Sequence, residues 1–261
     1  MSSLIGRVKP ARAIGLMGHV IADYPSPVAV RQMIQTMVSA GATVIEIQIP
    51  FSEPMADGPF FLAANHQALA QGVTYAASLR LMAEVSSAYP QVAFVFMSYL
   101  NVVFQRGYGN FVTEAVTHGA AGAIIPDLPL EYAAQLEAAG AAVDFANIRI
   151  LAPNAPAQRL SELVCGARGI LYAVARAGVT GASSDLRQVQ TFVSHIKSLT
   201  ALPVAVGFGV RSAQDVRQLI GHADYAIIGT ASLQAFAAGG LEGFKGFWQE
   251  LSVASDPHKV Q

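Results

Sequence analysis

The sequence predicts an α/β fold, namely one closed (βα)8 barrel in which eight parallel strands form the core and helices surround them. Three observations lead to this prediction. The chain has 261 residues, which is a normal length for a single barrel of this type. Short apolar runs alternate with amphipathic helical patterns along the chain. No linker, low-complexity tract or short-period repeat interrupts this order, so we expect residues 1–261 to form one domain.

Each predicted strand is a short apolar run. Eight such runs cover residues 13–22, 43–49, 92–99, 121–127, 145–151, 169–175, 203–209 and 225–230. Helical patterns lie between them, for instance over residues 27–41, 130–140 and 212–222. Several of these end at glycine, the usual residue where a helix must turn left-handed. The alternation is typical of a TIM barrel, and a doubly wound open sheet is the alternative.

The composition excludes several classes of function. Hydrophobic residues make up 53% of the chain and charged residues only 13%, against a usual charged share of about 25%. So little charge favours either a thoroughly layered α/β fold or a large interface with another subunit. The net charge is −1, the pI is about 6.6, and no run of lysine or arginine occurs. We therefore expect no binding to nucleic acid or to a membrane surface.

Cysteine and histidine usage points to a cytoplasmic protein without a metal site. The single cysteine, Cys165, excludes an intrachain disulfide and a cysteine-based zinc motif, and it fits a reducing compartment. The histidines show no metal-ligand spacing. No apolar run approaches the roughly 18 residues of a membrane span.

The strand predicted over residues 43–49 carries polar residues where a buried strand should be apolar. Ile45, Ile47 and Ile49 share one face, which should pack on the helices, because side chains alternate along a strand. Glu46 and Gln48 lie on the other face and should point into the barrel near the strand's C-terminal end, where barrel active sites are built. The alternative is a buried acid held by local hydrogen bonds.

A stiff acidic loop follows this strand. Pro50, Pro54 and Pro59 restrict it, and Asp57 with the following glycine provides turn geometry. The loop can bring Asp57 over a ligand that faces the strand's glutamate. Two carboxylates in different surroundings can then divide the work, one carrying a proton and the other staying ionised. A plain turn aspartate is the alternative. Glu53 should face solvent or a partner.

Glycines near the ends of the last strands predict a phosphate site. They lie in the segments "GVTGASS", "GFGVRS" and "IIGTAS". In a barrel, the loops after strands 7 and 8 and a helix N-terminus commonly bind phosphate. The candidates are Gly181, Gly209, Gly229 and Thr230. Their spacing matches neither a Walker nor a dinucleotide fingerprint.

Apolar residues at strand ends could line a flat pocket, although each alone could equally be ordinary core. They are Tyr99, Ile150, Tyr172 and Phe208. His19, at the end of the first strand, is either a residue of the barrel interior or a hydrogen-bonded core histidine.

The segment "IEIQIPFSEPMADGP" (45–59) resembles the signature of the tryptophan synthase α subunit family, roughly E-x-G-x-P-F-S-D-P-x-A-D-G-P. Further matches follow in the family's order and spacing. They are "MSYLN" (97–101), "IIPDLP" (124–129), "GVTGA" (178–182), "PVAVGFGV" (203–210) and "IIGTA" (227–231).

The resemblance implies a lyase that cleaves indole-3-glycerol phosphate to indole and glyceraldehyde 3-phosphate by a retro-aldol reaction. It implies that Glu46 is the general acid/base that protonates indole C3, and that Asp57 accepts a hydrogen bond from the indole N–H. It assigns phosphate binding to Gly181, Gly209 and Gly229, with Thr230 where the family usually has serine. Tyr99, Tyr172 and Phe208 match indole-pocket positions, and Thr180 matches a threonine that meets the aspartate when the site closes.

The resemblance also implies a partner. The family's α subunit docks on a β subunit that carries pyridoxal phosphate, in an α2β2 heterotetramer, and this chain itself is expected to hold no cofactor. The docking face is expected around Pro50, Glu53, Pro54 and Asn101. Two other interpretations stay open: another phosphate-binding barrel enzyme, or an α-like barrel retained mainly to activate a β subunit.

Some residues depart from the family's pattern. Gln48 and Asp23 each replace a glycine, and His19 occupies a position that is often aromatic. Phe60 and Phe61 replace a smaller pair, and Glu53 replaces aspartate. The reaction class expected from the resemblance is unchanged by them.

Overall fold

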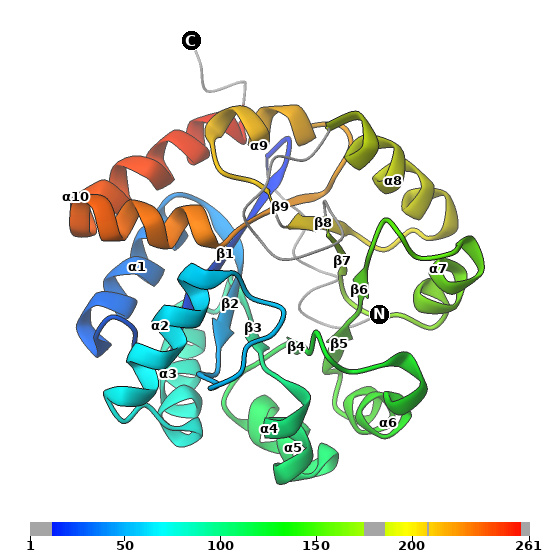
Figure 1. Cartoon of the computed structure of the whole chain (residues 1–261), viewed down its shortest axis with the longest axis horizontal. Helices are drawn as coiled ribbons and strands as arrows, with labels where there is room; N and C mark the ends of the chain where they lie inside the picture. Colours follow the sequence, from blue (N-terminus) through cyan, green and yellow to red (C-terminus); the bar gives the residue numbers. More distant parts are fainter. Residues whose placement is uncertain (1–11, 175–185, 208, 257–261) are drawn as a thin grey trace.

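A parallel sheet curls around the centre of the chain, and the helices form a ring outside it (Figure 1). The computed structural model describes residues 12–174, 186–207 and 209–256. Neighbouring strands pair in parallel in the order β5-β4-β3-β2-β1-β9-β8-β7-β6. The described strands are β1 (Gly15–Ile21), β2 (Ala42–Gln48), β3 (Ala93–Met97), β4 (Gly122–Ile124), β5 (Ala146–Ile148), β6 (Ile150–Leu151), β7 (Leu171–Val174), β8 (Val204–Gly207) and β9 (Tyr225–Ile228).

The barrel closes through one interrupted strand. β5 pairs with β4, while β6 pairs with β7, and only Arg149 separates the two segments. The carbonyl of Arg149 still accepts a hydrogen bond from the backbone N–H of Tyr172, at 3.0 Å. β5 and β6 are therefore two parts of the single strand predicted at 145–151. The described segments form eight barrel strands, which confirms the (βα)8 prediction over the open-sheet alternative.

Some of the helices begin at a residue whose side chain caps them. Ser26 accepts a hydrogen bond from the backbone N–H of Ala29 at the start of α1, and Pro27 occupies the first turn. Ser212 and Asp215 form a capping box at α9. The described α-helices are α1 (Pro27–Ser39), α2 (Pro59–Ala70), α3 (Tyr75–Ala88), α4 (Leu100–Arg106), α5 (Tyr108–Thr117), α6 (Ala134–Ala142), α7 (Ala157–Val164), α8 (Leu186–Leu199), α9 (Ala213–Leu219) and α10 (Thr230–Ala254), with a 3-10 turn η1 at Leu130–Tyr132.

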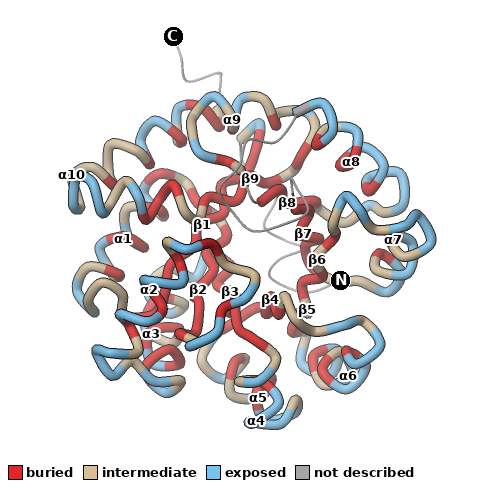
Figure 2. The backbone as a smooth tube through the Cα atoms, in the orientation of Figure 1, coloured by how far each residue is buried: buried red, intermediate tan, exposed pale blue. Residues whose placement is uncertain are grey.

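Two separate apolar clusters fill the molecule. One lies between strands and helices and includes Ile45, Ile47 and Ile49. The other fills the barrel interior and includes Val44, from the opposite face of β2. This confirms the predicted alternation along β2. Figure 2 shows the result, with buried backbone along the strands and exposed backbone on the outer sides of the helices. In the described part of the chain, every helix is too short or too polar to cross a bilayer.

Candidate active site

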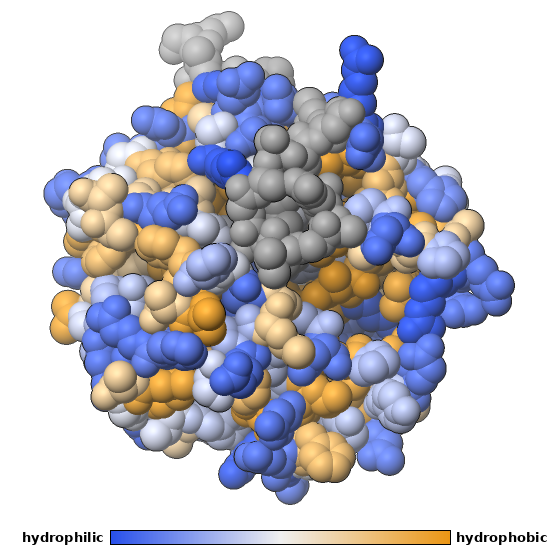
Figure 3. Space-filling view, viewed as in Figure 1, coloured by the Kyte–Doolittle hydropathy of each residue, from blue (hydrophilic) through white to orange (hydrophobic). Residues whose placement is uncertain are grey.

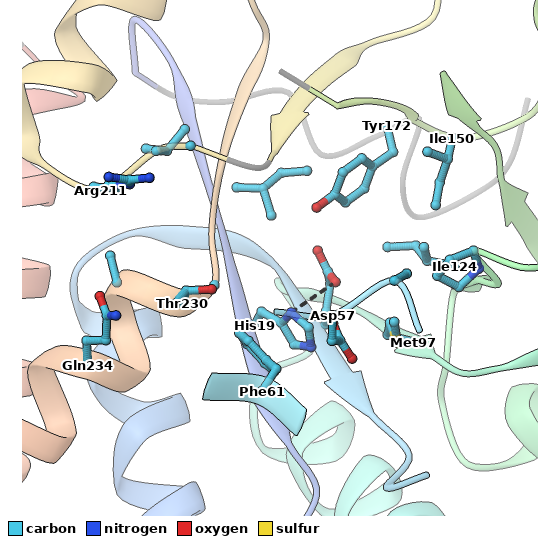
Figure 4. Close-up of a pocket in the computed structure, with 18 residues that line it drawn as sticks. His19, Asp57, Phe61, Met97, Ile124, Ile150, Tyr172, Arg211, Thr230 and Gln234 are labelled. Atoms are coloured by element: carbon cyan, nitrogen blue, oxygen red, sulfur yellow. Dashed lines mark ion pairs between the residues drawn. The ribbon is translucent and has the colours of Figure 1, made fainter. Parts of the chain in front are cut away.

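A cavity of about 190 Å³ opens at the C-terminal end of the barrel (Figure 4). It gathers side chains and loops from both halves of the chain. Of the residues predicted from the sequence, the following line it: Glu46, Asp57, Ile150, Tyr172, Gly209, Gly229 and Thr230. Thr180, Gly181 and Phe208 lie outside the described residues.

Glu46 lies in the middle of the barrel wall, where the register of β2 sets it beside His19 on β1 and Val95 on β3. Its side chain is 2% exposed, and its Oε1 atom has no hydrogen-bond partner among the described residues. Burial, with a smaller contribution from the negative charge of Asp57, raises the pKa of Glu46 to about 8. A neutral carboxyl group that borders a cavity can deliver a proton at neutral pH. The free Oε1 atom favours this role over an acid held by local hydrogen bonds.

Asp57, on the loop that follows β2, borders the same cavity and has different surroundings. Its Oδ2 atom accepts hydrogen bonds from Gln48 Nε2 at 2.7 Å and from the hydroxyl of Tyr99 at 3.1 Å. Burial raises the pKa of Asp57 to about 6, and the two hydrogen bonds act against that rise. The pKa of Glu46 is therefore raised further than that of Asp57, so Glu46 is the better proton donor and Asp57 the more readily ionised group. This is the division between two carboxyl groups that acid/base chemistry requires.

The loop between β2 and α2 is fixed by contacts on both sides. The backbone N–H of Phe51 donates to Asn65 Oδ1 at 3.1 Å, and that of Ala56 donates to the Tyr99 hydroxyl at 3.2 Å. The rings of Phe51 and Tyr99 stack with their centroids 5.2 Å apart. Tyr99 is fully buried behind Asp57 and does not border the cavity. Its contacts are those of a residue that holds the loop and the carboxylate.

Apolar and aromatic side chains lie on two sides of the cavity. Figure 4 shows Tyr172 and Ile150 on one side and His19 with Phe61 on the other. The imidazole of His19 stacks on the ring of Phe61, with 4.5 Å between centroids and 29° between planes. Met97 and Ile124 complete this flat, largely apolar part of the cavity.

The rim opposite Tyr172 and Ile150, beside His19 and Phe61, has the features of an anion site (Figure 4). Gly229 and Thr230 lie at the N-terminus of α10, and Gly229 makes no side-chain cap. The free N–H groups and dipole of a helix N-terminus favour an anion. Two further residues that border the cavity were not predicted from the sequence, Arg211 and Gln234. The sequence gives only weak indications that these two residues border the anion site. Arg211 follows Gly209 by two residues, and Gln234 is four residues after Thr230 on the same helix face.

The residues expected to dock a partner differ in exposure. Glu53 and Asn101 are exposed, whereas Pro50 and Pro54 are buried in this chain and shape the loop. Two large apolar side chains nearby in sequence are strongly exposed: Met55 at 74% and Phe104 at 69%. Asp23 has a positive φ of 52°, which is the left-handed conformation that suits the glycine it replaces. Its carboxylate forms an ion pair with Arg31, with 3.2 Å between Oδ1 and Nη1.

Comparison with known proteins gives a consistent result. The sequence model of the family described as "Tryptophan synthase alpha chain" matches residues 7–248. The chain is 40% identical over 235 residues to the tryptophan synthase alpha chain of Desulfotalea psychrophila, covering 90% of this chain and 92% of that one. It is 38% identical to the corresponding protein of Syntrophotalea carbinolica, covering 90% and 93%.

Solved structures agree with the sequence matches. A chain of Mycobacterium tuberculosis tryptophan synthase superposes with a TM-score of 0.86 at 32% identity, covering 94% of this chain and 93% of that one. Tryptophan synthase subunit alpha of Legionella pneumophila superposes with a TM-score of 0.84 at 28% identity, covering 94% and 93%. Fold, motifs and near full-length similarity lead to one conclusion: the chain belongs to the tryptophan synthase alpha chain family.

Proposed function

We propose that this chain, as the α component of tryptophan synthase, cleaves indole-3-glycerol phosphate to indole and glyceraldehyde 3-phosphate, with Glu46 as general acid/base and Asp57 as the group that stabilises the charged ring. One observation carries the assignment of residues. Glu46 and Asp57 border a single cavity that has an apolar wall and a glycine-lined anion rim.

The two carboxyl groups suit the two halves of the reaction. Protonated Glu46 delivers its proton to indole C3, and positive charge then develops toward the ring nitrogen. Ionised Asp57 accepts a hydrogen bond from the ring N–H and stabilises that charge. Glu46, now a carboxylate, removes the proton from the glycerol hydroxyl. The carbon–carbon bond breaks, its electron pair returns to the ring, and indole and an aldehyde are released with protons and electrons balanced.

The rest of the cavity suits the rest of the substrate. The flat wall with Tyr172 and Ile150 matches the shape and polarity of indole. The rim formed by Gly209, Gly229 and Thr230 offers backbone N–H groups to the phosphate. The family motif at 178–182 extends the proposal to Gly181 for phosphate and to Thr180 for contact with Asp57.

The proposal includes a β-subunit partner in an α2β2 assembly, with pyridoxal phosphate bound by that partner. Glu53, Met55, Asn101 and Phe104 are exposed beside the barrel mouth and supply an edge on which a partner could pack. Figure 3 shows that apolar side chains on the visible face form separate patches divided by hydrophilic ones. A cytoplasmic location belongs to the same proposal, because the lone Cys165 suits a reducing compartment.

Indole release from indole-3-glycerol phosphate tests the proposal, measured on the purified chain with and without a β subunit. We expect indole in both cases and a higher rate with the partner. A chain that releases no indole but raises the β subunit's condensation of serine with indole would be an activator only. A chain that does neither would be a different phosphate-binding barrel.

A further inference from the structure

Two buried polar residues beside the proposed acid and base have no role in the reaction described above. His19 on β1 and Gln48 on β2 are 8% and 0% exposed. Both depart from the family's usual pattern, and both lie on neighbouring strands whose register pairs His19 with Glu46. A buried amide and a buried imidazole are costly unless they are hydrogen-bonded, so their partners are informative.

The contacts form a continuous chain that starts at Asp57. Gln48 Nε2 donates to Asp57 Oδ2 at 2.7 Å, so the amide oxygen of Gln48 is turned the other way. That oxygen lies 3.1 Å from His19 Nε2. An amide oxygen can only accept, so His19 Nε2 must carry the proton. The charge on Asp57 therefore fixes the amide of Gln48, and the amide fixes the imidazole tautomer.

The other nitrogen of the same ring faces the proposed acid. In the tautomer with a proton on Nε2, the Nδ1 atom of His19 carries a lone pair. Nδ1 lies 3.6 Å from Glu46 Oε2, a separation marked by the dashed line in Figure 4. This distance is too long for a hydrogen bond, so the carboxyl group is aimed at an acceptor without being held by it. Stacking on Phe61 fixes the plane of the ring.

We propose that His19 and Gln48 are positioning residues that link the two proposed catalytic carboxyl groups, so that an ionised Asp57 presents the lone pair of His19 Nδ1 to the protonated carboxyl of Glu46. The inference rests on the proposed function and deepens it. Because His19 Nδ1 lies near Glu46 without forming a hydrogen bond to it, the lone pair favours the protonated form of Glu46. The proton of Glu46 stays free to move to a substrate.

The charges around this chain of contacts agree with it. Burial lowers the pKa of His19 to about 4, so the ring is neutral over the working range. The titratable groups that border the same cavity as His19 are Glu46 on β2, Asp57 on the following loop, Tyr172 on β7 and Arg211 at the rim. Burial raises the pKa of Tyr172 well above its usual value, so it stays neutral.

Removing the hydrogen bonds of Gln48 should move both the acidic and the basic limb of the pH profile of kcat/KM. In Gln48→Met, Asp57 loses a donor to its ionised form, so the acidic limb should move up by about one pH unit. The freed imidazole can then turn its N–H toward Glu46 and favour the carboxylate, so the basic limb should move down. His19→Phe added to Gln48→Met should return the basic limb toward its wild-type position, because the imidazole N–H that stabilises the Glu46 carboxylate is then gone.

Asn65→Ala is the matched control. Asn65 is also buried and also fixes the loop that carries Asp57, but it touches neither His19 nor Gln48. It should lower the rate without moving either limb. If the wild-type chain releases indole and Gln48→Met keeps both limbs in place, the inference is wrong while the proposed function stands. If the wild-type chain releases no indole, the proposed function fails first.

A measurement on the wild-type chain does not depend on activity. Histidine side-chain NMR reports which ring nitrogen carries the proton, and the difference from His19→Phe assigns the signal. We expect a neutral ring protonated at Nε2 from about pH 6 to 8. A cationic ring, or a proton on Nδ1, would overturn the inference.

Discussion

The hydroxyl of Tyr99 donates to Asp57 Oδ2 at 3.1 Å and accepts from the backbone N–H of Ala56 at 3.2 Å. One fully buried side chain on the end of β3 thus holds both the carboxylate and the backbone of the loop that carries it. The loop between β2 and α2 is therefore placed by a neighbouring strand as well as by its own prolines.

Tyr99→Phe should separate these two effects. Loss of a donor to the ionised form raises the pKa of Asp57, so the acidic limb of the kcat/KM profile should move to higher pH. The part-buried N–H of Ala56 loses its acceptor, which should cost about 1 kcal/mol of unfolding free energy in urea titrations. Tyr75→Phe, whose hydroxyl donates to Glu114 away from the cavity, is the control and should leave the pH profile unchanged.

Glu46→Gln should abolish indole release without unfolding the chain. Loss of a general acid/base costs a factor of about one hundred to ten thousand. The amide has nearly the same shape, and circular dichroism should match that of the wild type. Glu53→Gln makes the same chemical change at an exposed position of the adjoining loop and should keep the activity of the chain assayed without a β subunit. Equal turnover in the two variants would remove Glu46 from its proposed role.

The stability of the wild type should fall as the pH rises through the pKa of Glu46. Its folded-state pKa of about 8 lies above the unfolded value, so the folded state holds the proton more tightly and the stabilisation is lost on deprotonation. Between about pH 6.5 and 8.5 Asp57 is already largely ionised, so Glu46 dominates the change. Urea titrations across this range should show a decline in the wild type and a flatter profile in Glu46→Gln.

Arg211→Ala should weaken substrate binding more than turnover. Arg211 borders the cavity at the anion rim, where a guanidinium can meet a phosphate. We expect KM to rise by about tenfold with kcat little changed, because the contact is remote from the reacting bond. Arg217→Ala, on the exposed side of α9, is the control and should leave KM unchanged. An unchanged KM in Arg211→Ala would exclude a phosphate contact.

Phe104→Asp should weaken the complex with a β subunit. Phe104 is 69% exposed on α4, and a buried charge at an interface is costly. Sedimentation or calorimetry should show a higher Kd than for the wild type. Val253→Asp, at an exposed apolar position near the end of α10, should bind as the wild type does. Equal affinities would place the partner elsewhere.

The sequence was sufficient for features that depend on local periodicity. Alternation along residues 43–49 placed Glu46 in the barrel interior, and the apolar runs located the strands to within a few residues. Contacts between distant segments were not predictable in this way. The spacing of Tyr99 suggested a pocket residue, yet its hydroxyl is used behind Asp57. The bridge from Asp57 through Gln48 to His19 needs the register of β1 on β2, which no single segment contains.

The side chain of Arg149 adds contacts outside the barrel at the interrupted strand that β5 and β6 form. Its guanidinium binds Glu137 of α6 through Nη2 at 2.8 Å, and it donates to the carbonyls of Leu163 and Cys165 around the end of α7 at 2.9 and 2.7 Å. The Arg149 side chain thus connects α6 to the end of α7 on the outer side of the strand that β5 and β6 form. The residue that follows Arg149, Ile150, borders the cavity, so these contacts of α6 and α7 hold the cavity wall in place from behind.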